Sequence, residues 1–199
     1  MHDSDAPSET LYSDPWITVD TVPAQRGDGT TYPHRRIISG TGFGAIVIPR
    51  TVNRGLAYIA LVSQSRPAPG IEMSLELPRG GTIDLSRDEA MRELIEETGL
   101  QDAGLYLLGV IRPDTGLMNT SVGVWLAGIP AASAHLDESR SEWESGATCR
   151  WMMEADAYGA VRSGKITCGM TIAALGMLRM SHLATAPIST AAPDMSLRR

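Results

Sequence analysis

The stretch Ser86–Leu100 reads SRDEAMRELIEETGL and is the most informative part of this 199-residue chain. Its apolar residues recur at helical spacing. Ser86 and Glu89 form an S-x-x-E capping box, and Gly99 is typical of the position just after a helix. The sequence therefore predicts a helix over residues 86–98, with a tight turn before it at residues 80–81.

One face of this helix is predicted to be acidic. At about 100° per residue, four glutamates fall within one sector about 100° wide. They are Glu89, Glu93, Glu96 and Glu97. The opposite side carries Met91, Leu94 and Thr98. We expect the apolar side to pack on a core and the acidic side to point outward.

The acidic face has two possible explanations. Carboxylates one turn apart repel by a few tenths of a kcal/mol per pair, and most of these lie beyond the reach of the helix N-terminal dipole. They are either a solvated face, with Arg92 paired to Glu96, or ligands of a hard divalent cation such as Mg²⁺, which binds where carboxylates meet substrate phosphates.

Short strands are predicted on both sides of the helix, and two more helices follow. The expected strands are Trp16–Val19, His34–Ser39, Gly44–Pro49, Leu56–Ser63 and Met73–Leu77 before it, then Leu105–Ile111, Ser121–Ala127 and Ala147–Met153. The second and third helices are expected at residues 154–162 and 170–181. This order predicts an α+β fold with a mixed sheet, and not a regular βαβ alternation.

Composition excludes several classes of protein. With 17 basic and 23 acidic residues the net charge is −6, which argues against a nucleic-acid binder. The one lysine, Lys165, disfavours mechanisms that need a Schiff-base or phosphate-cradling lysine. Two cysteines, Cys149 and Cys168, make no disulfide framework.

The ends of the chain are expected to be disordered, over residues 1–13 and 183–199. The N-terminal residues are acidic and lack the pattern of a secretion signal. No segment approaches the roughly 18 consecutive apolar residues of a membrane span. We expect a cytoplasmic protein that binds neither membrane nor nucleic acid.

Residues 92–100, RELIEETGL, resemble the second half of the Nudix hydrolase box, G-x5-E-x7-R-E-U-x-E-E-x-G-U, where U is a bulky aliphatic residue. Further segments resemble the ADP-ribose pyrophosphatase branch of that family. They are DPWITVD (14–20), QSRP (64–67), LELPRGG (75–81), RPDTGLMN (112–119) and SGKITCGMTIAAL (163–175). The first half of the box departs from the family: the chain is shorter between Gly81 and Arg92, and Asp84 stands for the box's first glutamate by count alone.

The resemblance implies a Nudix fold over residues 14–182, in which a mixed sheet lies between helices. It implies hydrolysis of the pyrophosphate bond of ADP-ribose or a related nucleoside diphosphate sugar, with Mg²⁺ or Mn²⁺ as cofactor. The products would be a nucleoside monophosphate and a sugar phosphate. It also implies a homodimer, since the strands within residues 14–39 correspond to a segment that packs across a partner in this branch.

The resemblance also assigns the metal site. Glu93 and Glu97 are implied as the main ligands, with Glu96 assisting and the backbone at Gly80 lying close to the metal. Arg92 is implied to orient the glutamates by ion pairing. The shortened box leaves the number of metal ions open.

Substrate contacts are assigned in the same way. Arg66 is implied to bind phosphate and Glu76 to contact ribose or base; the other interpretation of Arg66 is an ion pair at a strand end. Trp16 is implied to stack on the base or, equally, to be a buried anchor of its strand, with Tyr32 a weaker candidate for the other side of the base. Trp125 is expected in the core.

The general base is expected on the loop over residues 135–144. Glu142 is the first choice and Glu144 the second, against the alternative that these acids only form a solvated loop.

Two further possibilities stay open. After Gly116 the chain reads LMNTS, without the acid common in related ADP-ribose enzymes, so another nucleotide sugar is an alternative substrate. The missing box glutamate leaves a second function, a nucleotide-sugar sensor with weak or no hydrolase activity.

Overall fold

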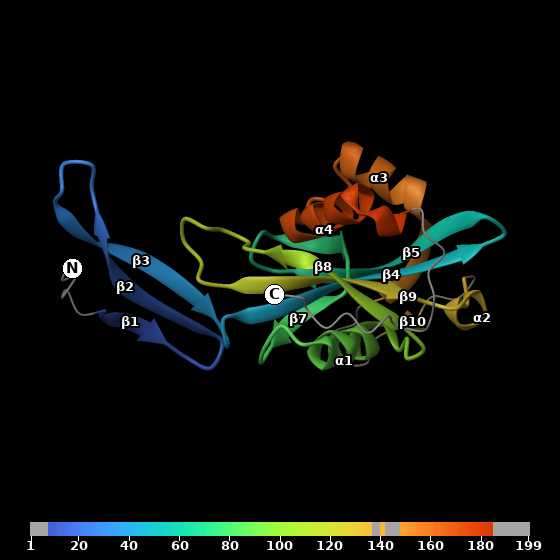
Figure 1. Cartoon of the computed structure of the whole chain (residues 1–199), viewed down its shortest axis with the longest axis horizontal. Coiled ribbons are helices and arrows are strands. Elements are labelled where there is room, and N and C mark those ends of the chain that lie inside the picture. The colour runs from blue at the N-terminus through green and yellow to red at the C-terminus, as the bar shows by residue number, and fades with distance from the viewer. Residues whose placement is uncertain (1–7, 137–139, 142–147, 185–199) are drawn as a thin grey trace.

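The computed structural model of the chain describes residues 8–136, 140–141 and 148–184. Two sheets and four α-helices make up these parts of the chain. Figure 1 shows a layered body, with a small sheet that projects from one end of it.

The central sheet is mixed. Its strands are β4 (Phe43–Asn53), β5 (Leu56–Arg66), β6 (Ile71–Glu76), β7 (Arg79–Thr82), β8 (Gly104–Ile111), β9 (Ser121–Gly128), β10 (Arg140–Ser141) and β11 (Thr148–Met153). The order is β10-β11-β5-β4-β9-β8, with β6 added to β5 and β7 added to β4. β4 and β9 pair in parallel and the other neighbours pair antiparallel.

Helices cover both faces of this sheet (Figure 1). On one face lie α1 (Arg87–Thr98) and α2 (Ala131–Ala134), and on the other lie α3 (Glu154–Arg162) and α4 (Gly169–Met180). A 3₁₀ turn, η1 (His182–Ala184), follows α4. The expected sheet between helices is therefore present.

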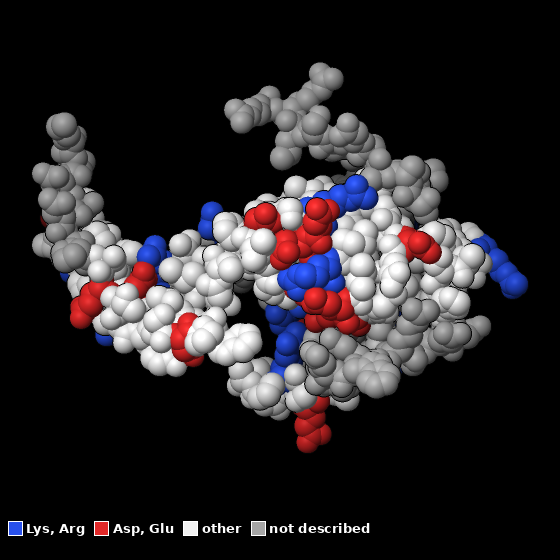
Figure 2. Space-filling view, turned by 90° about the horizontal axis from the view of Figure 1, so that it is seen from below, with Lys and Arg blue, Asp and Glu red and all other residues white. Residues whose placement is uncertain are grey.

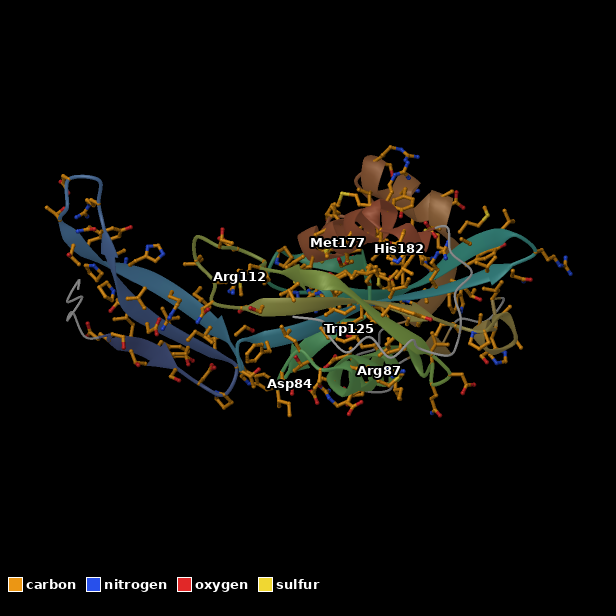
Figure 3. All side chains as sticks on the ribbon, viewed as in Figure 1. Asp84, Arg87, Arg112, Trp125, Met177 and His182 are labelled. Atoms are coloured by element: carbon orange, nitrogen blue, oxygen red, sulfur yellow. The ribbon has the colours of Figure 1, made fainter. Side chains whose placement is uncertain are left out.

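The core has two parts because β4 is buried on both faces. Ile46 and Ile48 join the cluster under α3 and α4, whereas Ala45 and Val47 join the cluster under α1. Burial on both faces explains why residues 43–49 of this strand are continuously apolar instead of alternating. Figure 3 shows the two layers: Trp125 lies on the α1 side of the sheet and Met177 on the α4 side. Trp125 is in the core, as predicted.

The sheet branches beside β4, and this branch positions the site. β4 pairs with β5 only over Arg50–Asn53 and with β7 over Phe43–Ile46. Between them the Val47 N–H donates to the Pro78 carbonyl, 2.9 Å away. The connection from β6 to β7 therefore passes from β5 to β4 at this branch, and β7 packs against α1.

The residues at 80–81 are a correction to the sequence analysis. They are not a tight turn but part of β7, in which Gly80 pairs with Ala45 and Gly81 with Gly44. Two of the four residues of β7 are glycines, which are depleted in strands, so no local pattern favours a strand there. The short α2 and β10 were also not predicted.

The projecting sheet contains β1 (Thr10–Ser13), β2 (Ile17–Gln25) and β3 (Thr31–Ser39). It is joined to the body by Ile37, which donates to the Leu117 carbonyl and accepts from the Asn119 N–H, both at 2.8 Å. The disorder expected for residues 1–13 is thus wrong for β1, and that expected from residue 183 is wrong for the last two residues of η1. Pairing with β2 orders β1 although its side chains are all exposed.

No helix in the described ranges is long and apolar enough to span a membrane.

Candidate active site

Local signals define α1 as predicted. Ser86 is the N-cap, and its hydroxyl accepts from the Glu89 N–H at 3.4 Å. Gly99 has a φ of 69°, and its N–H donates to the Ile95 carbonyl at 2.8 Å. The left-handed conformation explains why glycine ends this helix. The helix then packs on β4 and β7.

Glu93 does not point outward, which corrects the predicted acidic face. It is 5% exposed and lies against the backbone of Gly80. A Cβ added to Gly80 would lie 1.9 Å from Glu93 Oε2, so only glycine leaves space for the carboxylate there. Burial raises the pKa of Glu93, and the charge of Arg92 opposes that rise.

Glu97 lies one turn further along α1 and also contacts β7. Its Oε2 accepts from the Arg79 N–H at 2.9 Å. Glu93 and Glu97 therefore both face the backbone of β7, whereas Glu96 is exposed to solvent.

Arg92 is the main positive charge among these acids. Its guanidinium pairs with Glu93 and Glu96, each at 2.7 Å, and with Glu89 at 3.1 Å. It also donates to the Gly81 carbonyl at 2.9 Å. The Arg92–Glu96 pair expected of a solvated helix face is thus present. Figure 2 shows acidic and basic side chains together in one patch on the face that carries α1.

A second cluster forms around Glu76, which is 2% exposed. Arg66 donates to both of its oxygens, at 3.0 and 2.7 Å, Arg79 Nε donates at 3.0 Å and the Ser74 hydroxyl at 2.7 Å. Burial alone would raise the pKa of Glu76. The hydrogen bonds from Arg66 and Ser74 and the charge of Arg79 outweigh burial and lower that pKa to about 2.

This cluster changes the interpretation of two predicted substrate contacts. Arg66 makes the ion pair that was the alternative to a phosphate contact, although about a quarter of its side chain stays exposed. Glu76 is buried under arginines and is not placed to touch a ribose or base. Hydrogen bonding to Glu76, and the nearby charge of Glu97, raise the pKa of Arg66. The Arg66–Glu76 cluster therefore lies next to the α1 carboxylates.

Sequence reasoning missed the side chain of Arg79. Its position three residues after Glu76, in LELPRGG, is the only local signal. The pairing arises where the chain leaves β5 at the end of β6 and joins β4 at the start of β7, and a single sequence does not specify this branch.

The aromatic candidates lie on the projecting sheet. Trp16 is 78% exposed, and its carbonyl accepts from the Gly40 N–H at 2.6 Å near the junction with β4. Within one chain, Trp16 is therefore not a buried anchor of its strand. Tyr32 lies toward the other end of the β2–β3 ladder and contacts Arg26, whose guanidinium lies 4.5 Å from the ring centroid. It does not face Trp16 within one chain.

The two candidates for the general base, Glu142 and Glu144, lie outside the described residues. Among the described residues, no group of three or more His, Cys, Asp or Glu forms a metal-binding cluster.

The carboxylates of Glu93 and Glu97 nevertheless suit a hard cation. Mg²⁺ is commonly held by one or two carboxylates, with waters and substrate phosphates as the other ligands. Glu93 is a desolvated carboxylate that added positive charge would stabilise. The glycines of β7 leave its backbone accessible beside Glu93.

Comparison with known proteins supports the fold. No model of a known protein family matches the chain, and no curated protein matches it. Among solved structures, the chain is similar to one described as an ADP compounds hydrolase, with a TM-score of 0.66 and 15% identity, over 87% of this chain and 90% of that one. At this identity the likeness shows the fold alone. The α+β architecture expected from the Nudix resemblance is thereby confirmed.

Proposed function

We propose that this protein hydrolyses the pyrophosphate bond of ADP-ribose or a related nucleoside diphosphate sugar, with Mg²⁺ or Mn²⁺. The products are a nucleoside monophosphate and a sugar phosphate. One observation carries the proposal: Glu93 and Glu97 face the backbone of β7, and the charge of Glu97 is close enough to the Arg66 guanidinium to raise the pKa of that arginine. Carboxylates for a cation and arginines for phosphates are the two components that a diphosphate needs.

The carboxylates of α1 would hold the metal. Glu93 and Glu97 are the main proposed ligands, Glu96 assists, and Gly80 contributes its accessible backbone. A bound divalent ion supplies charge neutralisation and a more acidic water.

Arg66 and Arg79 would hold the diphosphate. Both donate to the one carboxylate of Glu76, so this group of three side chains carries a net positive charge. Glu76 fixes the direction of both guanidinium groups while leaving about a quarter of each side chain exposed. Planar guanidinium groups fixed in this way suit the oxygens of a pyrophosphate.

Two parts of the proposal rest on residues away from this centre. Trp16 would stack on the base, since its exposed ring is available for an aromatic contact. Glu142 stays the predicted general base. The name of the similar structure, an ADP compounds hydrolase, supports an adenosine diphosphate moiety in the substrate.

One observation favours the alternative of a sensor without hydrolase activity. Arg92 already neutralises Glu93 and Glu96, two of the three proposed carboxylate ligands. A bound nucleotide sugar would then persist without being cleaved.

A substrate panel separates the two functions. The purified protein is incubated with ADP-ribose and other nucleoside diphosphate sugars, with Mg²⁺, with Mn²⁺ and with a chelator, and the products are identified by mass. Metal-dependent release of a nucleoside monophosphate and a sugar phosphate supports the hydrolase. Thermal stabilisation by ADP-ribose without any product supports the sensor and contradicts the hydrolase.

A further inference from the structure

We propose that Glu89 is a positioning residue for the metal site: it holds Arg92 so that the guanidinium can release Glu93 and Glu96 to a divalent cation. This inference rests on the proposed function.

Arg92 and the metal would compete for the same carboxylates. The guanidinium lies 2.7 Å from oxygens of both Glu93 and Glu96, which are two of the proposed ligands. A divalent ion bound there would repel a guanidinium at this distance, because like charges interact strongly in a partly buried site. Arg92 therefore needs other acceptors when the metal binds.

Those acceptors are already in place. The Arg92 NH2 group that contacts Glu93 also donates to Glu89 Oε2 at 3.1 Å and to the Gly81 carbonyl at 2.9 Å. Glu89 Oε2 in turn accepts from the Ile83 N–H at 3.1 Å, so its carboxylate is fixed against the segment between β7 and α1. With the metal bound, Glu89 and Gly81 retain the guanidinium beside the site.

Asp84, which by count stands for the box's first glutamate, is not among the ion-pair partners of Arg92. Its Oδ1 accepts from the Ser86 N–H at 2.8 Å and stabilises the turn before α1, where Figure 3 shows it. The acid that contacts Arg92 from this part of the chain is instead Glu89, in the first turn of the helix. Glu89 therefore reaches Arg92 from within the same helix, three residues earlier.

The test compares Glu89→Gln with Asp88→Asn, which removes the same charge from an exposed position in the same helical turn. Mn²⁺ affinity is measured by calorimetry without substrate, after thermal melts show that each variant is folded. We expect Glu89→Gln to weaken Mn²⁺ binding about tenfold, because Arg92 then binds Glu93 and Glu96 more strongly. Asp88→Asn and Asp84→Asn should change the Mn²⁺ affinity less than about threefold.

A double-variant cycle shows whether Glu89 acts through Arg92. In an Arg92→Gln background, Glu89→Gln should weaken Mn²⁺ binding no more than Asp88→Asn does. The inference is overturned if Glu89→Gln matches Asp88→Asn in the wild-type background, if Asp84→Asn is the sensitive variant, or if the loss persists without Arg92. A wild-type protein that neither binds Mn²⁺ nor cleaves any substrate overturns the proposed function as well. The three outcomes above overturn only the role of Glu89, so the two kinds of failure can be told apart.

Discussion

The approach of Glu93 to Gly80 is the residue-scale feature on which the site depends. A buried carboxylate is costly unless it is paired or hydrogen-bonded. Glu93 is paired with Arg92 and occupies space that a side chain at Gly80 would fill. Any change that moves Glu93 therefore changes the charge beside β7.

Replacement of Gly80 by alanine should displace Glu93. The new Cβ would lie 1.9 Å from Oε2, too close for the carboxylate to keep its position. We expect Gly80→Ala to lower kcat at least about tenfold, because the displaced carboxylate no longer faces the proposed metal. Steady-state kinetics on the best substrate of the panel measures this loss.

Gly81→Ala is the matched control. It lies in the same strand, and a Cβ there would meet nothing within 4 Å. Its kcat should stay close to that of the wild type. Equal losses in the two variants would show that the effect comes from alanine in β7 and not from the contact with Glu93.

The motif predicted which acids share the helix but not how each one is buried. A helical wheel gives angular positions, and it placed Glu93 with the outward-facing acids. The burial of Glu93 depends on Gly80, which lies in a strand that no local pattern predicts. Arg79 was missed for the same reason, because its contact with Glu76 depends on β6 pairing with β5 and β7 pairing with β4.

At the scale of elements, Glu76 connects three strands. It belongs to β6 and accepts hydrogen bonds from Arg66 at the end of β5 and from Arg79 at the start of β7. These contacts fix the point where the sheet branches beside α1. The stability of this part should therefore depend on the ionisation of one carboxylate.

The pH dependence of unfolding tests this connection. The pKa of Glu76 is lowered from 4.5 to about 2. Its stabilisation is complete above about pH 4.5 and is lost as the pH falls toward 2, and a shift of this size corresponds to about 3 kcal/mol. In urea unfolding, the difference in unfolding free energy between wild type and Glu76→Gln should shrink by about that amount over this range.

The control for this measurement is Glu72→Gln, an exposed position on the same strand. Its unfolding free energy should follow that of the wild type at every pH. A Glu76→Gln variant that keeps the full acid sensitivity of the wild type would show that other carboxylates cause it.

Elements with local signals were predicted, and those that depend on distant pairing were not. The capping box and the final glycine delimit α1, and apolar runs predict the hairpin of β4 and β5. β1 and β7 carry no such signal. They are ordered by backbone pairing with β2 and β4, and a single sequence does not specify these partners.

At the scale of the whole molecule, the projecting sheet is the least buried part of the described chain. Its edge strand β1 is exposed along its length and carries Leu11 at 46% exposure. Trp16 and Ile17 are exposed beside it. Edge strands with exposed apolar side chains readily pair with another chain, so we expect the predicted homodimer to form through β1.

Light scattering tests the dimer. We expect the wild-type chain to have twice the mass of one chain in solution. Leu11→Asp should shift it toward the monomer because the substitution adds charge to the proposed interface. A monomeric wild-type protein would contradict the expected dimer without affecting the proposed metal site.

The account depends most on the claim that carboxylates of α1 hold a divalent cation for diphosphate hydrolysis. Its most direct test is kcat with Mg²⁺ for wild type and Glu97→Gln, with Glu72→Gln as the control for loss of charge. We predict that Glu97→Gln stays folded and lowers kcat at least about 100-fold, while the control keeps wild-type activity. Turnover by Glu97→Gln at the wild-type rate would contradict the account.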